Sequence, residues 1–183
     1  DSKIGTSSYR REFQIKKIRP DLNFKLIRGN VDTRIKKLNE GFYDAVILSY
    51  AGIKSLKMDN EISEIFSVKD LIPSAGQGII SLQCRQGDSE IISILEKINH
   101  KETYYRAFTE RNILKVLEGD CETAVGVYSK IDGDSITVEA ELFSLDGSQR
   151  FYEKQTNNVK KFKEIGLEIG KILKTKSNNS YKR

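Results

Sequence analysis

The feature that most constrains the fold is a change of pattern between the two halves of the chain. Short apolar runs alternate with helical patterns over residues 3–48, whereas three strand-like runs follow one another at 124–131, 135–143 and 149–155. Strands that alternate with helices are typical of a parallel sheet, and consecutive strands joined by Asp-Gly turns are typical of an antiparallel one. The sequence therefore predicts an α/β unit with a parallel or mixed sheet, followed by a small α+β unit with a three-stranded antiparallel sheet.

Local signals divide the first unit further. Residues 3–5 read as the end of a strand, hydroxyl side chains at 6–8 can cap a helix that runs to about Ile18, and residues 23–27 read as a strand. A second helix is expected over 31–39, where Gly41 stops it. The nearly all-apolar run 44–48 predicts a central strand that is covered on both faces.

Three further expectations concern the middle and the end of the chain. Residues 79–84 predict a strand in which Cys84 is a buried small side chain. Helices are expected at 88–99, from about 102 to 117, and at 158–173. The polar, basic tail 174–183 predicts disorder. No apolar run approaches the 18 or so residues that a membrane span needs, so no membrane association is expected.

The charge is concentrated at the N-terminal end. Residues 1–37 hold eleven basic side chains against four acidic ones, a net charge of +7, whereas the whole chain carries +5. Such a block favours an anionic partner. Nucleic acid, lipid headgroups and polycarboxylates all fit the charge, but the sequence contains no nucleic-acid-binding motif, so no nucleic-acid partner is expected.

Two arginine-bearing loops occupy equivalent positions, each between a strand and a helix. The first, GTSSYRR at 5–11, combines hydroxyl groups, a helix N-terminus and two arginines; the second, RGNVDTR, spans 28–34. Both suit a carboxylate or a phosphate, although an ordinary serine cap beside a solvated arginine pair explains the first equally well. Because ligands of open α/β sheets bind beyond the carboxyl ends of the strands, the two loops are expected to converge on one crevice.

The two cysteines lie in different contexts. Cys121, in LEGDC, stands between acidic residues in a loop, which predicts an exposed thiol, and an incidental surface cysteine is the simpler interpretation. The pair shows neither a disulfide framework nor metal-ligand spacing, and His100, the one histidine, lies at a polar helix end. The sequence thus predicts a cytoplasmic protein without a metal site.

Seven motifs in fixed order resemble the porphobilinogen deaminase (hydroxymethylbilane synthase) family. They are GTSSYRR, RPDL, RGNVDTRIKKLNEGFYDAVILSYAGIK, LIPSAGQGII, QCR, ER and LEGDC. The resemblance implies a transferase of tetrapyrrole (heme and porphyrin) biosynthesis that joins four porphobilinogen molecules into hydroxymethylbilane and releases ammonia at each step. The chain grows on a dipyrromethane cofactor that is thioether-linked to the cysteine corresponding to Cys121.

The resemblance also implies roles for the two loops, because every pyrrole of the product carries an acetate and a propionate. Arginine pairs with such carboxylates through a planar fork of donors. The implied cofactor-binding residues, besides Cys121, are Ser8, Arg10, Arg11 and Arg34. The implied residues for porphobilinogen and the growing polypyrrole chain are Thr6, Arg28, Asn30, Arg34 and Gln77.

Three domains are expected from the resemblance. Residues 1–76 correspond to most of a second α/β domain like a lobe of the periplasmic binding proteins. Residues 77–98 correspond to a hinge and a segment that completes a first domain, and residues 99–183 to a cofactor-bearing third domain. The catalytic aspartate of the family belongs to the first domain, which is mostly absent from this chain, so no catalytic residue is assigned here. An N-terminal domain, in cis or in trans, is therefore an expected partner, with a monomer as the complete enzyme and an inactive chain on its own.

One departure from the family pattern keeps an alternative open. The family usually has an arginine directly after AGIK, where this chain has Ser55. A lysine nearby cannot reproduce a planar bidentate contact. A non-catalytic module that binds small anions on the same scaffold therefore remains the alternative, and an adduct on Cys121 distinguishes the two.

Overall fold

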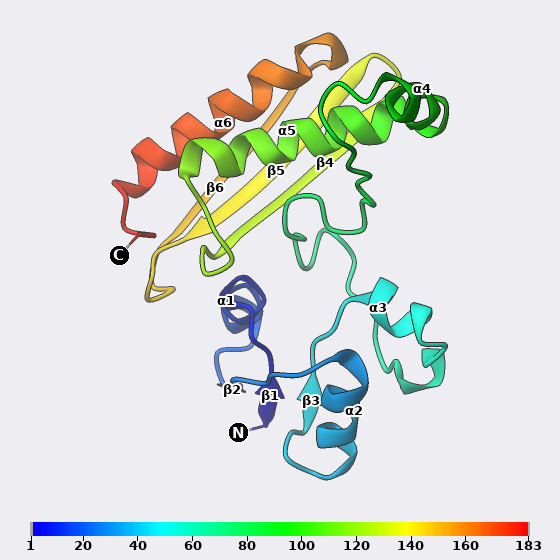
Figure 1. Ribbon diagram of the computed structural model, residues 1–183. Coiled ribbons are helices and arrows are strands. Elements are labelled where there is room, and N and C mark those ends of the chain that lie inside the picture. The colour runs from blue at the N-terminus through cyan, green and yellow to red at the C-terminus, as the bar shows by residue number, and fades with distance from the viewer. Residues whose placement is uncertain (1, 183) are drawn as a thin grey trace.

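A computed structural model describes residues 2–182. These residues form two units, one below the other in Figure 1. The lower unit contains the parallel strands, and the upper unit contains the antiparallel sheet with two long helices. The elements of the lower unit are β1 (Lys3–Gly5), α1 (Tyr9–Ile18), β2 (Asn23–Lys25), α2 (Val31–Asn39), β3 (Ala45–Val46), α3 (Tyr50–Ser55) and the 3-10 helix η1 (Asp59–Glu61). Those of the connection and the upper unit are α4 (Ser89–Ile98), α5 (Lys101–Leu117), β4 (Val125–Asp132), β5 (Ser135–Phe143), β6 (Arg150–Asn158), the 3-10 helix η2 (Val159–Lys161) and α6 (Phe162–Ser177).

The lower sheet is parallel, as predicted, but its order corrects one expectation. The strands lie in the order β2-β1-β3, so the apolar run 44–48 contributes a two-residue strand at the edge, where Ala45 is exposed. The central position belongs to β1, whose Ile4 pairs with Phe24 on one side and with Ala45 on the other. An apolar run favours a segment that packs against the core, but the number of neighbouring strands depends on segments far away in sequence.

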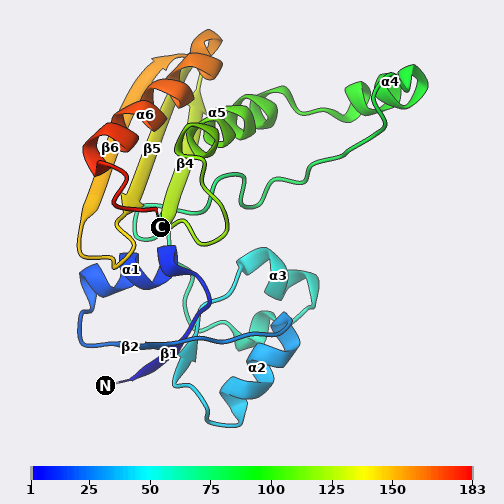
Figure 2. The same cartoon turned by 60° about the vertical axis from the view of Figure 1, so that its left-hand side comes forward.

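The upper unit has the predicted antiparallel sheet in the order β4-β5-β6, with α5 and α6 packed on one face (Figures 1 and 2). Its core joins residues from both helices to alternate residues of the strands, among them Ile113, Val138 and Ile169, all fully buried. The helices approach closely because Gly166 and Gly170 lie at their contact. A Cβ at Gly166 would lie 2.3 Å from the carbonyl oxygen of Thr109.

The connection between the units differs from the prediction. Residues 79–84 form no strand: Ile80 is 89% exposed, Leu82 is 59% exposed, and Cys84 is half-buried rather than buried. The helix α4 is present, as predicted, and Asp88 is its N-cap. None of its residues is buried, and it projects from the body of the molecule (Figure 2). A strand requires a hydrogen-bonding neighbour, and within residues 2–182 this segment has none.

The C-terminal tail corrects a further expectation, because it is ordered up to residue 182. Helix α6 continues to Ser177, past the expected end near residue 173, and Tyr181 is only 3% exposed. A polar composition does not exclude order when one aromatic side chain reaches the core. Among the helices of residues 2–182, none is both long and apolar enough to cross a membrane.

Candidate functional site

The first arginine loop is built around the start of α1. Gly5 ends β1 where space is short, since a Cβ there would lie 3.0 Å from the side chains of Tyr43 and Val46. The backbone then turns through Thr6, whose Oγ1 accepts a hydrogen bond from the Ser8 amide at 3.2 Å. Ser8 caps the helix as predicted, with its Oγ accepting from the Arg11 amide at 3.4 Å.

Arg10 and Arg11 both point back into the protein from the first turn of α1. Arg10 is 5% exposed, and its guanidinium donates to the Ile72 carbonyl at 2.6 Å and to Gln77 Oε1 at 3.3 Å. Arg11 donates to the Ile47 carbonyl at 2.8 Å, beyond the end of β3. Both arginines therefore also tie α1 to neighbouring segments, which the sequence did not predict.

The charges of these arginines are crowded. Burial, and then the neighbouring Arg11 guanidinium, lower the pKa of Arg10 to about 10, although Glu141 acts in the opposite direction. Burial, and then the positive charge of Arg34, lower the pKa of Arg11. An anion bound here would relieve the repulsion between the guanidinium groups, so the electrostatics favour a carboxylate or phosphate ligand.

The second arginine loop contacts the first through one side-chain hydrogen bond, so the two loops meet, while a crevice that both of them line stays a prediction. Arg34, on α2, donates to the Gly29 carbonyl at 2.7 Å and to Ser7 Oγ of the first loop at 3.4 Å. Arg28 is exposed. Asn30 is the N-cap residue of α2, but its side chain makes no capping hydrogen bond. The side-chain amide of Asn30 is therefore not used as a cap, and its binding role stays a prediction.

A pocket of about 420 Å³ opens beside these arginines. Its lining is largely aliphatic, and Arg10, Arg11 and Gln77 contribute polar groups to it. Three acidic residues also line it: Asp44, Glu61 and Glu64. Arg28, Arg34 and Asn30 lie outside this pocket. The structure thus brings Gln77 to Arg10, a contact that the sequence did not predict, and leaves Arg28 on the outer surface.

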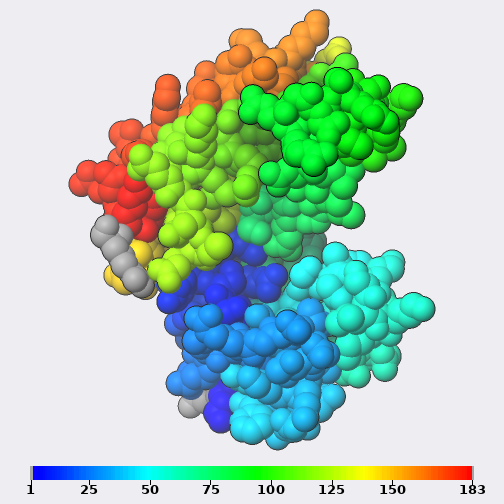
Figure 3. Space-filling model, in the orientation of Figure 1, coloured from blue at the N-terminus to red at the C-terminus, as the bar shows by residue number. Residues whose placement is uncertain are grey.

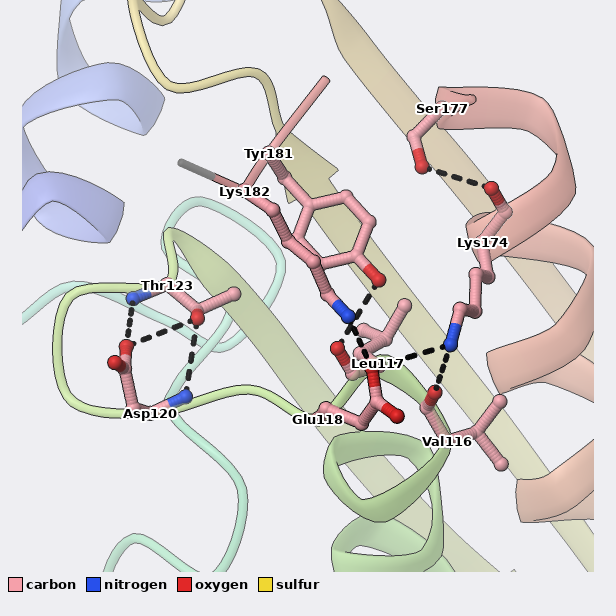
Figure 4. A network of polar contacts seen from close by, with 9 residues as sticks. All are labelled: Val116, Leu117, Glu118, Asp120, Thr123, Lys174, Ser177, Tyr181 and Lys182. Atoms are coloured by element: carbon pink, nitrogen blue, oxygen red, sulfur yellow. Dashed lines mark hydrogen bonds and ion pairs between the residues drawn. The ribbon is translucent and has the colours of Figure 1, made fainter. Parts of the chain in front are cut away.

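Cys121 is exposed, as predicted, in the loop between α5 and β4. Asp120 shapes that loop, because its Oδ1 accepts from the amides of Glu122 at 2.9 Å and Thr123 at 3.0 Å (Figure 4 draws the Thr123 contacts). These hydrogen bonds, first the one from the Glu122 amide, lower the pKa of Asp120. The residue next to the thiol is therefore held as a carboxylate in a closed turn.

The cysteine loop lies beside the start of α1. Glu122, next to Cys121, and Tyr9, next to Arg10, line the same small pocket of about 170 Å³. In the space-filling view the surface around residue 120 lies directly above the blue surface of α1 (Figure 3). The fold therefore brings the Cys121 loop to the start of α1, although neither Cys121 nor an arginine lines this small pocket.

Two family models match the chain. The model described as porphobilinogen deaminase, dipyromethane cofactor binding domain, matches residues 1–93, and the model described as porphobilinogen deaminase, C-terminal domain, matches residues 104–175. The chain belongs to the porphobilinogen deaminase family. The family carries out a transferase step of porphyrin biosynthesis, and the arginine loops fall within its dipyrromethane-binding domain, whereas Cys121 falls within its C-terminal domain.

The donors at the start of α1 fit the cofactor of the porphobilinogen deaminases. Dipyrromethane is a polycarboxylate, and Arg10, Arg11 and Arg34 are cations whose mutual repulsion an acidic ligand would relieve. Within residues 2–182, no group of three or more histidine, cysteine or acidic side chains is arranged to hold a metal ion.

One residue that the sequence reasoning missed joins the two matched domains. Glu110, in the quoted motif ER, is 3% exposed, and its Oε2 accepts from the Gly76 amide at 2.7 Å. Its Oε1 accepts from the amide and the hydroxyl of Ser129 at 3.0 and 2.6 Å. The signal was an acidic residue four positions before Leu114, which packs against the core from α5. The partners of Glu110 were not apparent from the sequence.

Proposed function

We propose that this chain, together with an N-terminal domain, is a porphobilinogen deaminase that condenses four porphobilinogen molecules into hydroxymethylbilane, with release of ammonia. The dipyrromethane primer would be attached to Cys121 through a thioether. The observation that carries the proposal is that the loop with the exposed Cys121 lies beside the start of α1, the helix that bears Arg10 and Arg11.

The residues of this chain would bind and orient. Ser8, Arg10, Arg11 and Arg34 would hold the carboxylates of the cofactor. Arg28, Asn30, Thr6 and Gln77, with Arg34, would hold those of incoming porphobilinogen and the growing chain. When bound, the dipyrromethane supplies the pyrrole carbon to which the first porphobilinogen is joined.

Binding by this cluster has a clear physical basis. A hydrogen bond between ionised partners contributes about 1.5–3 kcal/mol, more than a neutral one. Arg11 already donates to a backbone carbonyl, and a guanidinium has five N–H donors, so further donors remain for a ligand. Burial of the arginines strengthens their interaction with an anion relative to fully solvated cations.

The domain division belongs to the same proposal. Residues 1–76 would form the second domain, 77–98 the hinge and the segment that completes the first domain, and 99–183 the third. Support comes from Ile80 and Leu82, which are exposed on an extended segment that has no neighbouring strand within residues 2–182. The N-terminal domain would supply that neighbour and the catalytic aspartate, in a cytoplasmic enzyme that is monomeric when complete.

Mass spectrometry of the full-length protein, purified from its host, tests the proposal. A pyrrolic adduct is expected on the peptide that contains Cys121, together with colour formation by an aldehyde reagent for pyrroles. Cys121→Ser should abolish both, whereas Cys84→Ser, the matched control, should retain both. Active protein without an adduct, or with the adduct on Cys84, would refute the assignment. Inactive protein without an adduct would favour the alternative, a non-catalytic anion-binding module. Ser55 is consistent with that alternative, because the family usually has an arginine at this position. Its hydroxyl donates to the Ala51 carbonyl at 2.8 Å.

A further inference from the structure

The chain reverses direction after α6 and returns to the end of α5. Asn178 and Asn179 have φ angles of +45° and +59°, so two successive residues adopt the left-handed conformation. Asparagine tolerates this conformation better than other non-glycine residues do. The Leu145 amide then donates to the Ser180 carbonyl at 3.0 Å, which fixes the returning segment against the β5–β6 connection.

Tyr181 anchors this returning segment in the core of the upper unit. Its side chain is 3% exposed and belongs to the cluster that contains Leu117 and Val125. Its hydroxyl donates to the Leu117 carbonyl at 3.0 Å (Figure 4). Leu117 ends α5, and a carbonyl in the last turn of a helix has no partner within the helix, so Tyr181 satisfies a group that would otherwise be buried without one.

Two lysines hold the next residue of the chain. Glu118 has a φ angle of +53°, and its Oε2 accepts from Lys174 Nζ at 3.3 Å and from Lys182 Nζ. Lys174 Nζ also donates to the Val116 carbonyl at 3.3 Å (Figure 4). The hydrogen bond from Lys182, followed by that from Lys174, lowers the pKa of Glu118. Each ion pair is exposed and contributes little alone, but all three contacts act on residues 116–118.

The Cys121 loop begins where these contacts end. Gly119 follows Glu118 directly and donates to the Leu114 carbonyl at 3.0 Å, and Asp120 then closes the turn around Cys121. The loop therefore leaves from a helix end whose last carbonyl and first left-handed residue are both held by the C-terminal segment. The match to the C-terminal domain of the family ends at residue 175, before this segment begins.

We propose that residues 178–182 form a C-terminal latch, with Tyr181 as the positioning residue, that holds the Cys121 loop in place for attachment of the cofactor. Only the role of the latch in cofactor attachment rests on the proposed function. Its physical effect, restraint of residues 118–123, is independent of any ligand.

The test uses the full-length protein with Tyr181→Phe, which retains the buried ring and removes only the hydroxyl. Amide hydrogen exchange at Gly119 and at residues 121–123 should become about fivefold faster, which corresponds to about 1 kcal/mol for one hydrogen bond. Deletion of residues 178–183 should accelerate it more than tenfold. Tyr152→Phe is the matched control, because its hydroxyl contacts Glu139 on the sheet at 2.9 Å, and it should leave loop exchange unchanged.

A second readout separates positioning from stability. The apo form of the Tyr181→Phe variant should acquire the Cys121 adduct several-fold more slowly than the Tyr152→Phe protein, at an equal urea midpoint. Unchanged loop exchange in Tyr181→Phe, or adduct formation at the wild-type rate, would overturn the latch. A wild-type protein that never acquires an adduct would overturn the proposed function instead, and loop exchange alone would then decide whether the latch restrains the loop.

Discussion

The carboxylate of Glu110 is expected to hold the connection between the two units in place. It lies on α5 with 3% exposure and accepts three hydrogen bonds, one from the Gly76 amide and two from Ser129. Gly76 directly precedes Gln77, whose Oε1 accepts a hydrogen bond from the Arg10 guanidinium. One buried side chain of the upper unit therefore sets where the connection leaves the arginine cluster.

Replacement of Glu110 by alanine should be costly. It leaves three donors without their acceptor, and each unsatisfied buried donor costs about 1–3 kcal/mol. Water that enters the vacated space can hydrogen-bond to some of these donors, so we expect a loss of about 3–5 kcal/mol in the free energy of unfolding, the lower part of the range for three such donors.

Glu110→Gln should have a smaller and more local effect. Glutamine offers one oxygen in place of two, and that oxygen can keep both bonds to Ser129. The amide nitrogen then faces the Gly76 N–H, which is a donor against a donor. We expect a loss of about 1–3 kcal/mol, together with faster amide exchange and faster proteolysis at residues 74–78.

Urea unfolding followed by far-UV circular dichroism measures the free energy, and the tyrosines serve as a second probe because the chain has no tryptophan. Glu168→Ala is the control, since this residue is exposed on α6. A loss below about 1 kcal/mol in Glu110→Ala would refute the reasoning, because it would mean that Gly76 and Ser129 find other partners at no cost.

Three further predictions follow from the site. Arg11→Leu in the complete enzyme should weaken cofactor or substrate binding about ten- to a hundredfold, the equivalent of one charged hydrogen bond. Lys36→Leu, on an exposed helix face, should have little effect. Equal losses of affinity in the two variants, measured by titration with porphobilinogen, would mean that overall charge matters rather than a shaped site. The isolated chain should consume no porphobilinogen until an N-terminal domain is added, and turnover by the chain alone would place the catalytic group within these residues. The Cys121 loop should loosen in acid, because the pKa of Asp120 is lowered in the folded protein. The stabilising effect of the Asp120 carboxylate is fully present above the ordinary pKa of 3.8 and is lost as the pH falls through the lowered pKa. The amide NMR signals of Glu122 and Thr123 would report this change.

Much of the candidate site could be predicted because its signals are local. The Ser8 cap, the helix Val31–Asn39 and the exposure of Cys121 all depend on residues within a few positions of one another. The convergence of the two arginine loops follows from a general property of parallel sheets. What was not apparent is that Arg10 and Arg11 also bind backbone carbonyls, since Ile72 and Ile47 are brought to them by the fold.

The sequence by itself determined most of the helices and strands, the helix α3 and the run 79–84 excepted, and how the chain divides into a parallel and an antiparallel unit. It could do so because hydrophobic period, caps and turns act over short distances. The tertiary structure decided what depends on distant partners. The run 79–84 is apolar enough for a strand but remains unpaired, β1 rather than the more apolar run 44–48 lies at the centre of its sheet, and a polar tail is ordered by Tyr181. For β1 and for the tail, the deciding contact joins residues that lie far apart in the sequence; for the run 79–84, such a contact is missing within residues 2–182. A local pattern carries no information about contacts of this kind.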